Sequence, residues 1–165
     1  MPAVSPPPDD RGETLLELIV AVMIMSVAMV AVLGGIATSI LMSDIHRKQA
    51  TAGVTVRNYA EAIGNTVAGG GYQSCAATGT YGTPAGFTPP AGYAASVAQV
   101  RYWNGSAWQS SCSAATDTGL QQVTAQVTSD AAISVAQCAD DHRCVREQVV
   151  VVLRKPCGVG DPPCG

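Results

Sequence analysis

The strongest constraint on this chain is a run of 25 residues without a charged side chain, from Leu18 to Met42. As an α-helix the run is about 37 Å long, since each residue adds about 1.5 Å. The hydrocarbon core of a bilayer is about 30 Å thick, so the run can cross it with some tilt. The rest of the 165 residues leaves room for one small domain. We therefore expect a single-pass membrane protein with a small domain outside the bilayer.

Six cysteines follow that run, and none lies within it or before it: Cys75, Cys112, Cys138, Cys144, Cys157 and Cys164. An even number of cysteines on one side of a membrane is typical of disulfides in an oxidising compartment. A zinc site is the alternative, but the chain has no C-x2-C pair, and His46 and His142 are far apart in sequence. We therefore expect disulfides, no metal and no cofactor.

The pairing of these cysteines is not fixed by the sequence. The simplest hypothesis has two short closures, Cys138–Cys144 and Cys157–Cys164, with Cys75–Cys112 tying a loop to a strand.

The segment before the apolar run is unlike an ordinary secretory signal. It reads MPAVSPPPDDRG, which is proline-rich and acidic, with Arg11 as its one basic residue. A secretory signal has a basic start, an apolar stretch of about 7–15 residues and a cleavage site after that stretch. Here the apolar run is too long, and the residue that looks like a processing signal, Gly12, lies before it.

The sequence GETLLELIVAV, which starts at Gly12, resembles the type IV prepilin (class III) signal, usually written G-F-T-L-I-E-L. Gly12 matches the glycine before the cleavage site, and Thr14 and Leu15 match T-L. Leu16 takes the place of isoleucine, and Glu17 with the leucine after it matches E-L. The resemblance covers this motif and the whole apolar run that follows.

In that family a prepilin peptidase cuts after the glycine on the cytoplasmic face and methylates the new N-terminus, which here would be Glu13. The mature helix then moves from the membrane into a filament core. The resemblance thus implies three partners: the prepilin peptidase, other pilin subunits and the membrane. It places the chain in the bacterial cytoplasmic membrane with its C-terminal domain extracytoplasmic, and later in a surface filament.

A carboxylate within an apolar helix costs a few kcal/mol, so Glu17 requires an explanation. Cleavage after Gly12 creates an α-amino group that is largely cationic at neutral pH, since its pKa is about 8. In a bundle of identical helices stepped along their axes, Glu17 of one chain can meet that amino group on the next. Because an unpaired charge in an apolar core is expensive, this pairing would set the register of assembly. The alternative is a carboxylate that snorkels at a helix end.

Two departures from the family pattern favour a minor pilin or pseudopilin over an abundant major subunit. Glu13 stands where the best-known major pilins have phenylalanine, and its carboxylate can partly neutralise the adjacent amine. Many major pilins also have a proline about twenty residues into the mature chain. The run here has none, and Gly34-Gly35 is the nearest source of flexibility.

Beyond the apolar run the helix is expected to continue as an amphipathic element. Ile45, Ala52 and Tyr59 recur every seven residues, as do Val56 and Ile63, which gives one apolar stripe. Three glycines at 69–71 end the helix. The expected divisions are a leader at 1–12, a transmembrane or filament-core helix at 13–42, its amphipathic continuation at 43–68, and a disulfide-stabilised β domain at 69–165.

Strand signals follow a loop-like stretch over residues 66–96. SVAQVRYW, then NG, then SAWQSSC indicate a hairpin, in which Trp103 and Trp108 either pack across the strands or form an exposed contact patch. QQVTAQVT alternates, and in REQVVVVLR the four successive valines suggest a strand partly covered on both sides. The residues expected on the inner faces are Val123, Ala125, Val127, Val149, Val151 and Leu153. The predicted fold is α+β, a long helix packed on a small, mostly antiparallel four-stranded sheet.

Charge and motifs exclude several function classes. The net charge is −3 and the longest basic run is His46-Arg47-Lys48, which we interpret as a membrane flank, so direct nucleic-acid binding is not expected. By charge counting that flank predicts the opposite orientation, and the side of the cysteines and the Gly12 motif outweigh it. There is no G-x-S-x-G, no H-E-x-x-H and no Cys-His-Asp cluster, so we do not expect an enzyme. Asp140-Asp141-His142 is interpreted as a solvated loop tip. The alternative to a pilin-like subunit is a membrane-anchored extracytoplasmic binding or adhesion module that is not assembled into filaments.

Overall fold

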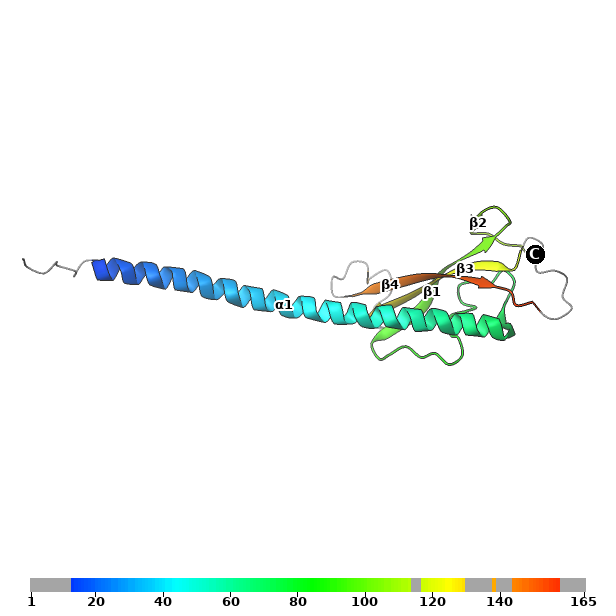
Figure 1. Ribbon diagram of the computed structural model, residues 1–165, viewed down its shortest axis with the longest axis horizontal. Helices are drawn as coiled ribbons and strands as arrows, with labels where there is room; N and C mark the ends of the chain where they lie inside the picture. Colours follow the sequence, from blue (N-terminus) through cyan, green and yellow to red (C-terminus); the bar gives the residue numbers. More distant parts are fainter. Residues whose placement is uncertain (1–12, 114–116, 130–137, 139–143, 158–165) are drawn as a thin grey trace, which may run out of the picture. The chain divides into compact units, whose positions relative to one another are not determined.

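The computed structural model describes residues 13–113, 117–129, 138 and 144–157. One long helix, α1 (Glu13–Thr66), precedes four strands: β1 (Tyr93–Trp103), β2 (Trp108–Gln109), β3 (Leu120–Ser129) and β4 (Arg146–Arg154) (Figure 1). The strands form one antiparallel sheet in the order β2-β1-β3-β4. The expected α+β architecture, a long N-terminal helix packed on a four-stranded antiparallel sheet, is confirmed.

The chain divides into two compact units, Met1–Asp44 and Ile45–Gly165. The described part of the first unit is the apolar half of α1. The second unit holds the outer half of α1 together with the whole sheet. The amphipathic part of the helix is therefore an integral element of the β domain.

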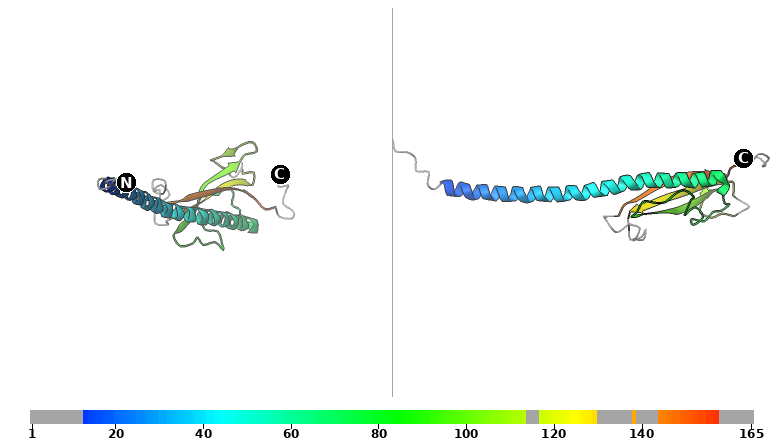
Figure 2. Two further views of the ribbon diagram at one scale, coloured as in Figure 1. Left: turned by 60° about the vertical axis from the view of Figure 1, so that its left-hand side comes forward. Right: turned by 90° about the horizontal axis from the view of Figure 1, so that it is seen from below.

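The core of the second unit lies between the outer half of α1 and one face of the sheet (Figure 2). The predicted helix stripe is confirmed, with Ala52, Tyr59 and Ile63 fully buried and Val56 3% exposed. Across from it, β3 contributes three apolar residues with no exposed surface, Val123, Ala125 and Val127. These two surfaces bury each other because each presents apolar side chains at the period of its own secondary structure.

Strand β1 contains a β-bulge, because its register to β3 shifts between Val97 and Gln99. The two neighbours of Ala98 pair with consecutive residues of β3, so Ala98 is the extra residue. As a result Val97 and Val100, three positions apart, both face the core and are 8% and 7% exposed. A regular strand would have placed them on opposite faces.

Strand β4 is an edge strand, and its alternate residues divide cleanly between the two faces. Val149, Val151 and Leu153 pack on the core as predicted. Val150 and Val152 are 53% and 57% exposed, and no described residue covers them. The prediction that this strand is partly covered on both sides is therefore wrong for the described residues. β-branched residues suit any pleated surface, whether or not it is buried, so successive valines do not by themselves predict cover on both faces.

The hairpin between β1 and β2 forms where Asn104-Gly105 predicted it, with a loop of four residues between the paired Trp103 and Trp108. The side-chain oxygen of Asn104, Oδ1, accepts hydrogen bonds from the backbone N–H groups of Ser106 and Ala107, at 2.9 and 2.8 Å. Gly105 has φ +98°, a conformation that glycine adopts without steric cost.

Helix α1 ends as the three glycines predicted, through a π-helical turn at Val67–Gly71. Gly70 has φ +96°, so the backbone leaves the helix there. At Gly71 an added Cβ would lie 2.7 Å from the Thr66 carbonyl oxygen, whereas Gly69 has open space around it and an ordinary φ. The turn therefore requires glycine at 70 and 71 and not at 69.

We expect Gly70→Ala and Gly71→Ala each to destabilise the β domain by about 1–2 kcal/mol, because a Cβ is disfavoured at the first site and clashes at the second. Gly69→Ala is the matched control and should be neutral or slightly stabilising. Urea denaturation of the full chain in a neutral detergent, followed by circular dichroism, measures the difference. Equal stability of the three variants would contradict this account of the helix end.

Candidate functional site

The apolar half of α1 is exposed along its whole length. Between Leu15 and Met42 every large apolar side chain is exposed, and Val20, the least exposed of them, still shows 46% of its surface. A patch of this size is rare on a soluble monomer, and a helix that is apolar on all sides is typical of a membrane span or of the centre of a helix bundle. Among the described elements, α1 is long and apolar enough to cross a membrane.

Two hydroxyl groups in this segment bond to their own helix. The Ser26 hydroxyl donates to the Met23 carbonyl oxygen at 2.8 Å, and the Thr38 hydroxyl donates to the Gly34 carbonyl oxygen at 2.7 Å. Hydroxyl groups satisfied in this way cost little in a hydrocarbon environment. The segment is therefore compatible with lipid or with other apolar helices.

The residues of the predicted processing motif occupy the start of the helix. Gly12 lies outside the described residues, Glu13 is the first residue of α1, and Thr14 follows in the same helix. Leu15 and Leu16 are 65% and 71% exposed. Glu17 is exposed and makes no hydrogen bond or ion pair with any described residue.

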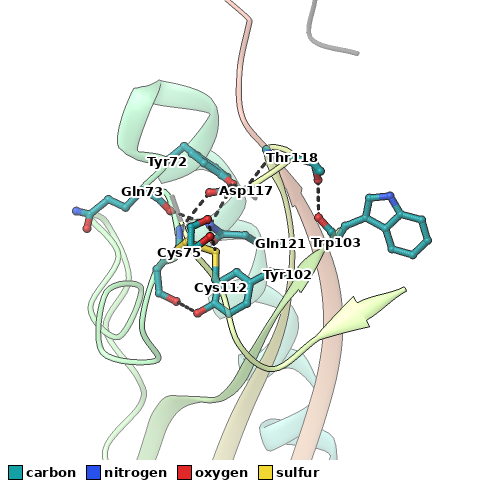
Figure 3. Close-up of a disulfide and its surroundings, with 12 residues drawn as sticks. Tyr72, Gln73, Cys75, Tyr102, Trp103, Cys112, Asp117, Thr118 and Gln121 are labelled. Atoms are coloured by element: carbon teal, nitrogen blue, oxygen red, sulfur yellow. Dashed lines mark hydrogen bonds between the residues drawn. A yellow bond between two sulfur atoms is a disulfide. The ribbon is translucent and has the colours of Figure 1, made fainter. Parts of the chain in front are cut away.

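A second site is built around the disulfide that joins Cys75 to Cys112, with Cα atoms 5.4 Å apart (Figure 3). This disulfide confirms the predicted pairing and ties the loop after α1 to the segment after β2. Cys75 has φ +54°, which is uncommon for a residue other than glycine. Such a conformation persists only where the surroundings hold it, and here a disulfide and a hydrogen bond do so.

The carboxylate of Asp117 lies beside this disulfide and accepts hydrogen bonds from four residues, one of them through the Ser74 side chain. The Tyr72 hydroxyl and the Gly119 backbone N–H each donate to Oδ1 at 2.9 Å, and the Cys75 backbone N–H donates to Oδ2 at 3.1 Å. Burial alone would raise the pKa of Asp117, but these hydrogen bonds outweigh it and hold the pKa below its ordinary value. Asp117 is therefore a fixed anion at neutral pH.

The side chain of Gln121, which is fully buried on β3, connects this carboxylate to the loop. Its amide nitrogen donates to the Tyr72 hydroxyl oxygen at 3.0 Å and to the Gln73 carbonyl oxygen at 2.8 Å. Its amide oxygen accepts from the Tyr81 hydroxyl at 3.1 Å. One glutamine thus joins β3 to three points of the loop that follows α1.

Tyr59 anchors the same loop from the helix. Its hydroxyl donates to the carbonyl oxygens of Tyr81 and Gly82 at 3.1 and 3.0 Å, and its ring lies 5.0 Å from that of Phe87, between centroids. Burial raises the pKa of Tyr59 to about 12. Tyr102 adds a further tie, because its hydroxyl donates to the Ala76 carbonyl oxygen at 2.7 Å.

The tryptophans of the hairpin pack against each other across the strands, with ring centroids 5.3 Å apart. The prediction of cross-strand packing is therefore confirmed. Both indoles keep part of their surface exposed, and Trp103 lines two shallow cavities of about 270 and 420 Å³. Figure 3 shows the Trp103 side chain pointing away from the disulfide cluster, with its carbonyl oxygen bonded to the Thr118 hydroxyl at 2.6 Å.

The other cysteines fit the disulfide prediction as far as the described residues reach. Cys138 and Cys144 are bonded, as expected, and Cys157 is also in a disulfide. Cys164 and the Asp140-Asp141-His142 tip lie outside the described residues. One group of metal-ligating residue types occurs in the described part, namely Cys75, Cys112 and Asp117. Its two sulfurs are bonded to each other, whereas a metal requires thiolates.

Sequence reasoning identified the cysteines of this cluster but not its polar members. Tyr72 lies 45 residues before Asp117 and 49 before Gln121, and aspartate and glutamine are common on protein surfaces. The available signal was the Asp-Thr-Gly triplet before β3, in which the aspartate accepts from the N–H two residues on.

Comparison of this chain with known proteins found no matching family model, no matching protein of curated function and no matching solved structure.

We expect the Asp117 network to make stability depend on pH in the acid range. The pKa of Asp117 is lower in the folded chain than its ordinary value of 3.8, so its stabilising effect is fully present above that value. The effect is lost as the pH falls through the folded-state pKa. Asp117→Asn should lower the urea midpoint at pH 7 and flatten its fall between about pH 5 and 2.

The matched control is Glu61→Gln, which removes a carboxylate from an exposed position on α1. This variant should keep the acid dependence of the unmodified chain. If the urea midpoint of Asp117→Asn falls in acid as steeply as that of the unmodified chain, the role assigned to the hydrogen bonds of Asp117 is wrong.

Proposed function

We propose that this chain is a type IV pilin-like structural subunit, a minor pilin or pseudopilin, which a prepilin peptidase cuts after Gly12 and which then assembles into a pilus or pseudopilus. The observation that carries the proposal is one combination: a GETLLEL motif at the start of a helix, followed by a segment whose apolar side chains are exposed on all sides.

The physical argument concerns where such a segment is stable. Its exposed apolar surface is satisfied in a bilayer, and equally at the centre of a bundle of similar helices, because lipid tails and apolar side chains are alike as solvents. A subunit of this kind can therefore exchange one environment for the other at small cost in apolar contacts. The two environments then differ in how they accommodate the charged carboxylate of Glu17.

The β domain supports the same proposal. Its disulfides indicate folding in an oxidising, extracytoplasmic compartment. The outer half of α1 contributes one whole side of its core, so the domain and the helix form one structural unit. Such a domain suits a subunit that is attached to a membrane or a filament through its own helix.

The first expected result is a mature N-terminus at Glu13. Mass spectrometry of the N-terminal peptide, from membranes and from sheared surface material of cells with an active prepilin peptidase, should find chains that begin at Glu13, with or without a methyl group. Gly12→Val should abolish this cut, while Gly34→Val, which changes a glycine within the apolar run, should leave it intact. Unmodified chains that begin at Met1 or Pro2 would contradict the proposal.

The second expected result concerns Glu17. Glu17→Val should insert into the membrane and be cut normally, yet its amount in sheared filaments should fall at least tenfold. Loss of one partner of a buried ion pair costs about 3–5 kcal/mol, because the other charge is left uncompensated.

Glu13→Gln is the matched control, since it removes a carboxylate one turn away and leaves Glu17 in place. This variant should still enter filaments. If Glu17→Val enters filaments at the unmodified level, the carboxylate is only a membrane-edge group and its proposed role in assembly is wrong.

The alternative is a membrane-anchored binding or adhesion module that is not assembled into filaments. It is favoured by the partly exposed indoles of Trp103 and Trp108 and by the two cavities that Trp103 lines. Aromatic side chains with exposed faces are common in binding surfaces. A chain found in the membrane fraction but absent from sheared surface material would favour this alternative.

A further inference from the structure

The disulfide between Cys75 and Cys112 has a carboxylate as an immediate neighbour. One carboxylate oxygen of Asp117 and the Sγ atoms of both cysteines all lie within 4.8 Å of one another. Figure 3 shows the three side chains meeting where the loop after α1 approaches the segment before β3. Both cysteines and Asp117 are half-buried, so small reagents can reach the group.

The position of this carboxylate is fixed. It accepts from the Tyr72 hydroxyl and from the backbone N–H groups of Cys75 and Gly119. The groups that lower its pKa are all hydrogen-bond donors, with no lysine or arginine among them. Among the described residues, the groups that act on this carboxylate are therefore hydrogen-bond donors rather than cations, and the charge beside the sulfurs is negative.

Reduction of such a bond by a thiol is a displacement at sulfur. A thiolate RS⁻ attacks one Sγ, the S–S bond breaks, a mixed disulfide forms, and the other cysteine leaves as a thiolate. A second RS⁻ attacks the sulfur of R in the mixed disulfide. This step releases RSSR and the second cysteine thiolate, and each cysteine thiolate can then take a proton from water. Negative charge approaches the sulfurs in every step, so a fixed anion nearby opposes them all.

We propose that Asp117 is an electrostatic guard of the Cys75–Cys112 disulfide, which makes reduction of this bond slowest for anionic thiols. The thiols whose reaction is slowed in this way include those with carboxylates, such as glutathione. Thiols with a positive group beside the sulfur are the least affected. The result is a disulfide that stays closed in the presence of small acidic thiols and so keeps the loop after α1 attached to the sheet. This inference does not depend on whether the chain assembles into filaments.

The test measures the reduction rate of this one bond with three thiols that differ in charge: cysteamine, mercaptoethanol and mercaptoethanesulfonate. The full chain in a neutral detergent is quenched with an alkylating reagent at successive times, and the peptides that contain Cys75 and Cys112 are quantified by mass spectrometry. For each thiol the rate in Asp117→Asn is divided by the rate in the unmodified chain. This ratio cancels the intrinsic reactivity of the thiol.

The expected acceleration in Asp117→Asn is graded, at about twofold with cysteamine, fivefold with mercaptoethanol and tenfold with mercaptoethanesulfonate. A variant that merely loosens the loop would accelerate all three reactions by one common factor. Equal acceleration for the three thiols, or no acceleration, would overturn the proposal.

Two further variants separate charge from structure. Tyr72→Phe removes one donor to the carboxylate and keeps its charge. The order of the reduction rates with the three thiols should therefore stay as it is in the unmodified chain. Glu147→Gln makes the same change in net charge near the other end of β3, where Glu147 pairs with Val127. It should produce no graded acceleration. If Glu147→Gln shows the same graded acceleration across the three thiols as Asp117→Asn, the effect is due to net charge and the proposed local role of Asp117 is wrong.

The unmodified chain supplies a second measurement that needs no folded variant. Raising the ionic strength from about 0.02 to 0.5 M screens the carboxylate. The rate with mercaptoethanesulfonate, relative to that with cysteamine, should then rise several-fold more for this disulfide than for bis(2-hydroxyethyl) disulfide, which is neutral. Identical salt dependence for the two disulfides would overturn the proposal.

Discussion

The rest of this molecule depends on one helix that carries two different surfaces. From Leu15 to Met42 α1 is apolar on all sides and exposed, whereas from Ile45 onward it has a single buried stripe. The stripe is satisfied within the chain, because the sheet covers it. No described residue covers the apolar half, which is long and apolar enough to cross a membrane. The boundary between the two units at Asp44 thus separates the apolar segment from the part of the helix that belongs to the domain core.

The β domain is small, and its long loop is held mainly by polar ties. Residues 72–92 form no strand or helix, yet Tyr59, Tyr102 and Gln121 bond to them from α1, β1 and β3. A loop of this length without secondary structure is costly in conformational entropy unless it is fixed at several points. The Cys75–Cys112 disulfide adds a covalent tie at one end of the loop. We therefore regard Asp117, with the disulfide and the donors around it, as the point at which that end of the loop is attached to the rest of the domain.

The sequence predicted those elements that repeat a local period, and it failed where distant residues decide. The helix stripe, the inner face of β3 and the hairpin at Asn104 all follow from spacing within short windows. The bulge at Ala98 does not, because it becomes visible only when β1 is aligned on β3. The exposure of Val150 and Val152 depends on β4 being an edge strand, which is a property of the whole sheet. Apart from the nearby Gly119, the partners of Asp117 lie in the loop after α1, 45 and 42 residues away in sequence, and no local pattern identifies them.

The two carboxylates on which the proposals depend differ in where their partners come from. Asp117 has its donors within its own chain, in the positions that stabilise its charge, and its role is therefore complete in a single subunit. Glu17 has no partner among the described residues and lies beside a surface that requires other apolar groups around it. Moving such a carboxylate into an apolar environment is unfavourable until an opposite charge meets it. A second processed chain would bring that charge as its α-amino group, so apolar packing and ion pairing would favour the same assembly.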